Sequence, residues 1–112
     1  MKVSHQLLDR DITLVNLDGR LDARTCTDVK NSISQLLRDG HLKIIVNLEK
    51  VPFIDSAGLV ALVSGLRMAN ETQGQMVLCG AQQQAQVVFR LTMLDRVFSI
   101  HPSQVEAQQS FA

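Results

Sequence analysis

The sequence contains no tryptophan, no tyrosine and only two cysteines, and it has no apolar run near the ~20 residues that cross a bilayer. Its 11 basic residues balance its 11 acidic ones, so the formal net charge is zero. A neutral chain without Lys/Arg clusters and stacking aromatics lacks a surface for binding nucleic acid. The N-terminal residues also lack the apolar core of a signal peptide. We therefore expect a cytoplasmic protein that engages neither nucleic acid nor membrane.

The two cysteines, Cys26 and Cys79, lie far apart and form no CxxC pair. We expect both to be small, buried and unpaired in a reducing compartment, rather than to form a disulfide or a metal site. The chain also lacks the Walker motif, the G-x-G-x-x-G fingerprint and the H-E-x-x-H zinc motif. These absences argue against a nucleotide cofactor or a zinc centre.

Length and hydrophobic content indicate one domain over residues 1–112, large enough to bury a core without disulfides. Strand-like segments occur at residues 3–8, 12–19, 42–51, 75–80 and 96–100. Helical spacing of apolar residues occurs at 22–40, 56–74, 85–94 and 103–111. The order β-β-α-β-α-β-α-β-α predicts an α/β domain. Its mixed β-sheet has parallel neighbours after the opening hairpin and helices mainly on one face.

Several residues mark the expected ends and faces of these helices. Asp22 is a candidate N-cap of the first helix, and Gly40 a candidate cap at its end. Ser103 and Glu106 have the spacing of a capping box for the last helix. The third helix is expected to bury Val88, Leu91 and Leu94.

The stretch "VPFIDSAGLVALVSGL", residues 51–66, passes from a strand to a helix at Asp55 and Ser56. One interpretation is a well-capped helix start, and spacing alone favours it. The other interpretation is that Ser56 is an exposed target for modification. The small residues Ala57 and Gly58 would then let the active site of another protein approach its hydroxyl. A phosphate there would add about −1.5 to −2 charges. The helix N-terminus would tolerate that anion, whereas a partner seated on the same surface would be repelled.

An enzymatic interpretation is weaker. Ser56, Asp95 and His101 occur in the chain order of an α/β-hydrolase triad. However, "IDSAG" lacks the glycine before the serine, and an adjacent acid would repel the oxyanion that such a site must stabilise. Asp22 and Asp55 could be an acid–base pair, but acids are common at helix starts for capping reasons. We predict that the chain is not an enzyme.

Three segments resemble one family over nearly the whole chain. They are "LDGRLDA" at 17–23, "IVNLEKVPFIDSAGLVAL" at 45–62 and "LTMLDRVFSIHPS" at 91–103. The sequence resembles the STAS domain family (sulphate transporter and anti-sigma factor antagonist), specifically its stand-alone bacterial anti-sigma factor antagonists. The DSxGL box is the specific element, and the other two segments add support through their order.

The resemblance implies a function by partner switching. In that family a serine kinase that is also the anti-sigma factor phosphorylates the serine after the aspartate, and a PP2C-type phosphatase removes the phosphate. The unmodified antagonist binds the kinase, which then releases its sigma factor. Carried over, Ser56 is the phosphoacceptor, and the partner-binding residues are Asp22, Asp55, Ser56, Ala57, Gly58 and Leu59. The alternative is a non-switching STAS scaffold or a binding subunit of a larger complex, such as a membrane-transport assembly.

Two residues depart from the family pattern. Met93 stands where a glycine is common, and methionine adopts a positive φ only at a cost, so the third helix is expected to end differently. Arg20 stands where an acid is frequent, which makes this loop less negative and changes which partner it selects. Val60, Met68 and Phe89 are expected to be covered by neighbouring helices rather than to form an exposed patch.

Overall fold

The computed structural model describes residues 1–111, apart from the side chain of Arg10. Within this range one sheet has the strand order β1-β2-β3-β4-β5. The strands are β1 (Lys2–Leu7), β2 (Ile12–Asp18), β3 (Lys43–Lys50), β4 (Gln75–Cys79) and β5 (Ile100–His101). The helices are α1 (Cys26–Arg38), α2 (Ser56–Glu71), α3 (Gln83–Leu91) and α4 (Gln104–Gln109), with short 3-10 turns η1 (Asp9–Asp11) and η2 (Leu94–Arg96). This element order confirms the predicted α/β alternation.

The pairing of the strands also agrees with the sequence. β1 runs antiparallel to β2, and β2, β3, β4 and β5 are parallel to their neighbours. β3 is the central strand, and its consecutive residues Ile44, Ile45 and Val46 are all fully buried. A strand with no solvent-facing side in its middle must be covered on both faces of the sheet.

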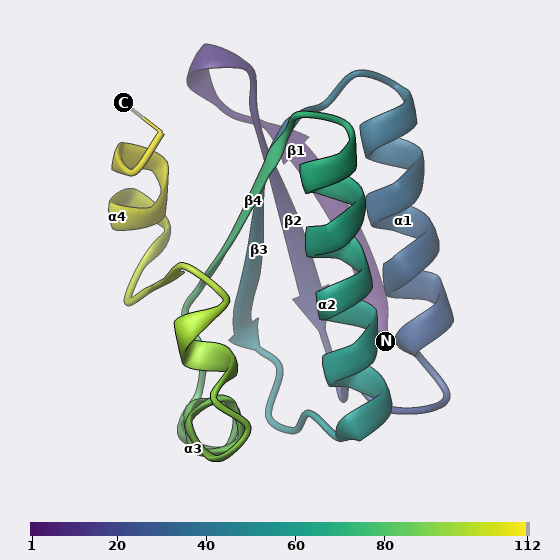
Figure 1. The fold of residues 1–112 in the computed structure, drawn as a ribbon, viewed down its shortest axis with the longest axis vertical. Coiled ribbons are helices and arrows are strands. Elements are labelled where there is room, and N and C mark those ends of the chain that lie inside the picture. Colours follow the sequence, from purple (N-terminus) through teal and green to yellow (C-terminus); the bar gives the residue numbers. More distant parts are fainter. Residues whose placement is uncertain (112) are drawn as a thin grey trace.

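The two faces are covered unequally. α1 and α2 lie side by side over one face (Figure 1), where the main core includes Val15, Leu17, Val29, Ile33, Val46 and Leu62. α4 covers part of the other face, where Ala107 packs with Ile12, Leu14, Ile45 and Val77. The helices therefore lie mainly on one face, as predicted. Ser103 accepts a hydrogen bond from the Glu106 N–H and caps α4, also as predicted.

The C-terminal third differs from the sequence prediction in two places. Leu91 is 78% exposed, because α3 buries Ala85 and Phe89, and Leu91 lies two residues further on, around the opposite side of the helix. The fifth strand begins at Ile100 rather than 96, because the chain first forms η2 and then packs Phe98 against Phe89, with ring centroids 5.9 Å apart.

The expected coverage of three apolar residues is only partly correct. Phe89 is buried and Met68 packs against the main core, as predicted. Val60 is 64% exposed, so the prediction of a covering helix was wrong there. Met93 adopts the left-handed conformation itself, with φ of 60°, so the expectation that methionine would avoid a positive φ here was wrong. The Met93 side chain is exposed, so no packing opposes this conformation.

The two cysteines have different environments, which predicts different reactivities. Cys79 is fully buried on β4, whereas Cys26 is only partly buried. Burial, and secondarily the Glu49 carboxylate, raise the pKa of Cys79 to about 11. Since the thiolate is the reactive form, iodoacetamide at pH 8 should label Cys26 in the native protein and Cys79 only after denaturation. Peptide mass spectrometry reports both sites, with Cys26→Ser as the unlabelled control. Equal native labelling would contradict this assignment.

Candidate functional site

Two loops meet beyond the ends of β2 and β3, and their backbones are hydrogen-bonded to each other. The first, residues 19–25, follows β2, and the second, residues 51–55, follows β3. The Leu21 N–H donates to the Phe53 carbonyl at 2.9 Å, and the Asp55 N–H donates to the Leu21 carbonyl at 3.2 Å. Leu21 also forms a parallel bridge with Ile54. The pairing of β2 and β3 thus continues into the loops and gives them one defined arrangement.

Gly58 places the first turn of α2 directly against this pairing. A Cβ atom at position 58 would overlap the Leu21 carbonyl oxygen and lie 2.8 Å from Leu21 Cγ. Only glycine lacks this atom, so the close approach of helix and loop requires it. Gly58 is buried, so the expectation that it leaves room for another protein's active site was wrong. Its small size serves an internal contact.

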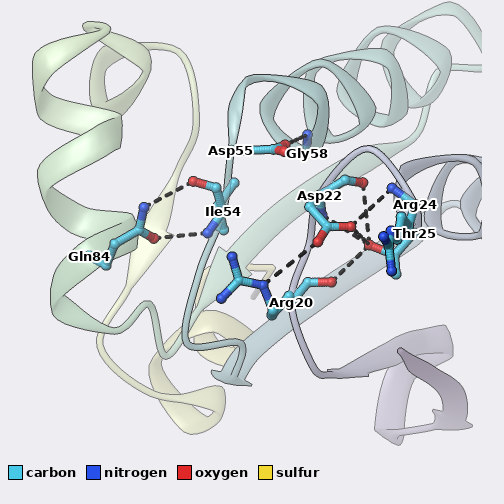
Figure 2. A network of polar contacts seen from close by, with 8 residues as sticks. All are labelled: Arg20, Asp22, Arg24, Thr25, Ile54, Asp55, Gly58 and Gln84. Carbon is cyan, nitrogen blue, oxygen red and sulfur yellow. Dashed lines mark hydrogen bonds and ion pairs between the residues drawn. The ribbon is translucent and has the colours of Figure 1, made fainter.

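The N-cap of α2 is Asp55, not Ser56. Asp55 has an extended backbone, and its Oδ1 accepts a hydrogen bond from the Gly58 N–H at 2.9 Å (Figure 2). Ser56 is the first residue of the helix and is exposed. The cap bond joins Asp55 to Gly58 and does not use the Ser56 hydroxyl. The predicted well-capped helix start is thus confirmed, with Asp55 as the cap, and Ser56 itself is left exposed beside it.

The other residues of the DSAGL segment divide between surface and core. Ala57 is half-buried beside Ser56, whereas Leu59 is 8% exposed and belongs to the main core. Val60, one turn after Ser56, is exposed and lies on the same side of the helix as the serine. The accessible part of the α2 start is thus formed by Asp55, Ser56, Ala57 and Val60.

Asp22 organises the loop before α1 rather than capping that helix. α1 begins at Cys26, after Thr25 in the cap position. The Asp22 Oδ1 accepts from the Arg24 N–H at 3.0 Å, and the Asp22 N–H donates to Thr25 Oγ1 at 3.0 Å (Figure 2). The predicted N-cap role was thus misplaced by one turn, because residues 22–25 form a separate turn before the helix. Asp22 lies on the loop that pairs with the one carrying Asp55.

Arg20 connects the two loops through its side chain. Its Nε lies 3.7 Å from the Asp22 Oδ2, and its Cζ lies 4.1 Å from the centroid of the Phe53 ring. Cation–π contact with an aromatic face restricts the guanidinium without neutralising it. The Arg20 side chain remains 61% exposed. It therefore places a guanidinium, paired with the Asp22 carboxylate, at a defined point on the surface formed by the two loops.

Gln84 is a residue of this region that the sequence analysis missed. From α3, its Nε2 donates to the Ile54 carbonyl and its Oε1 accepts from the Ile54 N–H, each at 2.9 Å (Figure 2). Ile54 is 1% exposed, so its backbone groups need such partners. The sequence shows three successive glutamines at 82–84, and nothing in that run distinguishes the one that faces Ile54.

The structure does not assemble a hydrolase triad. His101 and Asp95 line a cavity between α3, η2 and β5, and Ser56 is not among its lining residues. The His101 Nε2 is hydrogen-bonded to Ser99 Oγ at 2.9 Å. Within residues 1–111 there is no cluster of three or more histidine, cysteine, aspartate or glutamate side chains able to hold a metal ion. In the same range no helix has both the length and the apolarity to cross a membrane.

The contact between Gly58 and Leu21 predicts the effect of adding a methyl group. Gly58→Ala should lower the free energy of unfolding by about 2 kcal/mol, because overpacking outweighs the better helix propensity of alanine. Gly65→Ala in the same helix is the matched control, because its Cβ would meet the flexible ends of Ile33 and Met76 instead of backbone. Urea denaturation of both variants measures the difference. Equal stability of the two would contradict the required close approach.

Comparisons with known proteins agree with this architecture. Residues 8–107 match the STAS domain family. The chain is 28% identical over 87 residues to an anti-sigma-B factor antagonist of Staphylococcus aureus (strain NCTC 8325 / PS 47), which covers 78% of this chain and 81% of that protein.

Solved structures show the same fold. A crystal structure of a candidate anti-sigma factor antagonist from Thermotoga maritima matches with a TM-score of 0.90 and 25% identity, over 96% of this chain and 92% of that one. The Bacillus cell fate determinant SpoIIAA in its phosphorylated form matches with a TM-score of 0.76 and 21% identity, over 99% and 100% of the two chains. Since the family match spans most of the sequence, the chain belongs to the STAS domain family.

Proposed function

We propose that this protein is an anti-sigma factor antagonist that binds a serine-kinase anti-sigma factor and is released when Ser56 is phosphorylated. The observation that carries the proposal is the exposed Ser56 at the first position of α2, with Asp55 occupying the cap. The names of its relatives support the antagonist role. The phosphorylated form of SpoIIAA supports modification within the same fold.

The helix start favours a phosphate at Ser56 without rearrangement of the fold. The N–H groups of the first helical residues have no carbonyl partner one turn earlier. Such groups, together with the helix dipole, stabilise an anion at this end. The cap bond joins Asp55 to the Gly58 N–H and does not involve the Ser56 hydroxyl. A phosphate on the serine therefore replaces no part of this bond. The loops and the helix are expected to keep their positions in the modified protein.

Release would then come from repulsion at the surface. Two like charges 4 Å apart, at an effective dielectric constant near 20, repel by ~4 kcal/mol before screening by salt. The phosphate brings about −1.5 to −2 charges next to the Asp55 carboxylate. Even if salt and solvent reduce the repulsion between phosphate and partner to about 2 kcal/mol, binding weakens more than tenfold. A partner that presents carboxylates or a desolvated apolar surface to Ser56 would be displaced.

The partner supplies the chemistry in this proposal. The kinase holds ATP and the catalytic groups, a PP2C-type phosphatase reverses the reaction, and this chain contributes the Ser56 hydroxyl. Asp22, Asp55 and Ala57 are proposed contacts around it, with Val60 and the Arg20 guanidinium extending the same surface. The buried Gly58 and Leu59 are proposed to position this surface rather than to touch the partner.

Substitutions at Ser56 test the switch. With wild-type, Ser56→Ala and Ser56→Asp proteins as baits in a lysate of the native host, mass spectrometry should find a kinase-like ATPase on the first two. Binding to Ser56→Asp should fall at least tenfold, because the carboxylate adds a negative charge where the partner sits. Ser110→Asp, which adds the same charge at the exposed end of α4, should bind as the wild type does.

A second experiment distinguishes the effect of Ser56→Asp, which imitates phosphate only partly, from that of phosphorylation itself. Wild-type protein phosphorylated by the captured kinase should lose the partner more completely than Ser56→Asp, because the phosphate carries more charge. If the same proteins remain on every bait, including the phosphorylated one, the chain is a non-switching STAS scaffold and the proposal is wrong.

A further inference from the structure

The outer edge of β1 has no strand beside it within residues 1–111. β1 pairs only with β2, and five of its six residues are exposed. The opposite edge of the sheet, β5, is only two residues long and leads into α4. A strand edge as long as β1 presents a row of N–H and C=O groups that another strand can pair with.

β1 lacks the features that normally prevent edge pairing. Natural edge strands are protected by proline, by bulges or by charges in mid-strand. β1 has the sequence KVSHQL, without proline and with its single lysine at the first position. Its register with β2 runs without interruption from Lys2 opposite Asp18 to Leu7 opposite Thr13, so it contains no bulge. Within residues 1–111 this edge is therefore unbroken and unpaired over the length of β1.

We propose that β1 pairs antiparallel with β1 of a second copy of this chain, around a two-fold axis at His5, so that the two sheets become continuous. Residues opposite each other in an antiparallel pair point to the same face, and a two-fold axis perpendicular to the sheet keeps the faces equivalent. Odd-numbered residues must then lie opposite odd-numbered ones. Centring on His5 places Val3 opposite Leu7 of the second copy, and Leu7 opposite its Val3.

This register explains an exposed leucine. Leu7 is 65% exposed on β1, whereas Val3 already packs against the edge of the main core. The pairing extends that apolar surface by covering Leu7 of each copy with Val3 of the other. A register centred on Ser4 would instead place Val3 opposite the polar His5. Cross-strand side-chain pairs stabilise a sheet, and the register at His5 gives two apolar pairs where the register at Ser4 places Val3 opposite a polar residue, so the register at His5 is the better one.

Charges at the two ends of β1 are complementary in the same register. Lys2 of one copy would lie opposite Leu8 of the other and beside the start of its η1 turn. That turn carries the exposed acids Asp9 and Asp11 around Arg10, so its formal charge is negative. The two-fold axis repeats this contact at the other end of the strand pair. Opposite charges across neighbouring strands stabilise the pairing, and they disfavour a parallel arrangement.

The proposed dimer leaves the Ser56 surface free. α1 contacts both β1 and α2, and α1 and α2 lie side by side on the helical face (Figure 1). The start of α2 and the loop at 51–55 follow β3, two strands away from the pairing edge, and the loop at 19–25 follows β2, one strand away. Each copy would keep an exposed Ser56, so dimer formation and the proposed partner switch are independent.

Sedimentation equilibrium across a range of protein concentrations tests the dimer. The wild type should show a concentration-dependent monomer–dimer equilibrium. Leu7→Lys should weaken association at least tenfold, because it replaces the apolar pair in both halves of the interface. Leu91→Lys is the matched control, since Leu91 is also largely exposed, on α3, and it should associate as the wild type does. A wild type that is monomeric at every concentration would overturn the proposal, as would equal association of the two variants.

Cysteine cross-linking tests the register. In a Cys26→Ser background, His5→Cys should form an intermolecular disulfide on mild oxidation, because residues opposite each other at the two-fold axis have Cα atoms within disulfide range. Ser4→Cys, in the same background, should cross-link poorly, because Ser4 would lie opposite Gln6 of the second copy. Stronger cross-linking of Ser4→Cys than of His5→Cys would refute the proposed axis at His5.

Discussion

The pairing of Leu21 with residues 53–55 is the contact on which the site depends. Leu21 and Ile54 are both almost fully buried, although they lie in loops. A buried loop backbone must find hydrogen-bond partners, and here each loop supplies them for the other, with Gln84 satisfying the remaining groups of Ile54. Gly58 packs directly against the Leu21 carbonyl. This contact sets where α2 begins. The position of Ser56 therefore follows from contacts made by its neighbours.

The elements that sequence reasoning predicted correctly are those whose signal is local and unambiguous. Ile44, Ile45 and Val46 form an uninterrupted apolar run that suits a strand covered on both faces, and they are buried. Leu91 and Val60 were placed wrongly because apolar residues occur on more than one side of their helices. Spacing then identifies a helix but not which of its apolar residues the rest of the chain covers. That choice is made by tertiary contacts such as Phe98 against Phe89.

The site itself was predictable in place but not in detail. The change from strand to helix located Asp55 and Ser56, yet either side chain could have served as the cap. The extended backbone of Asp55 and its bond to Gly58 decide this, and they depend on the loop that contains Leu21. The same long-range contact explains the glycine of the DSAG stretch. No pattern within that stretch indicates that its glycine packs against a carbonyl oxygen more than thirty residues earlier.

The bonded framework around Ser56 also constrains how a modification there can act. A switch needs either an element with two arrangements or a direct change in what a partner touches. Here the Asp55 cap, the pairing at Leu21 and the Gln84 contacts hold the surrounding backbone in one arrangement, and none of them uses the serine hydroxyl. On the proposed function, phosphate therefore acts on the partner through charge and contact rather than through a change in this fold. A partner sensitive to the modification must then cover Ser56 itself, with Val60 and Arg20 at the edge of the contact.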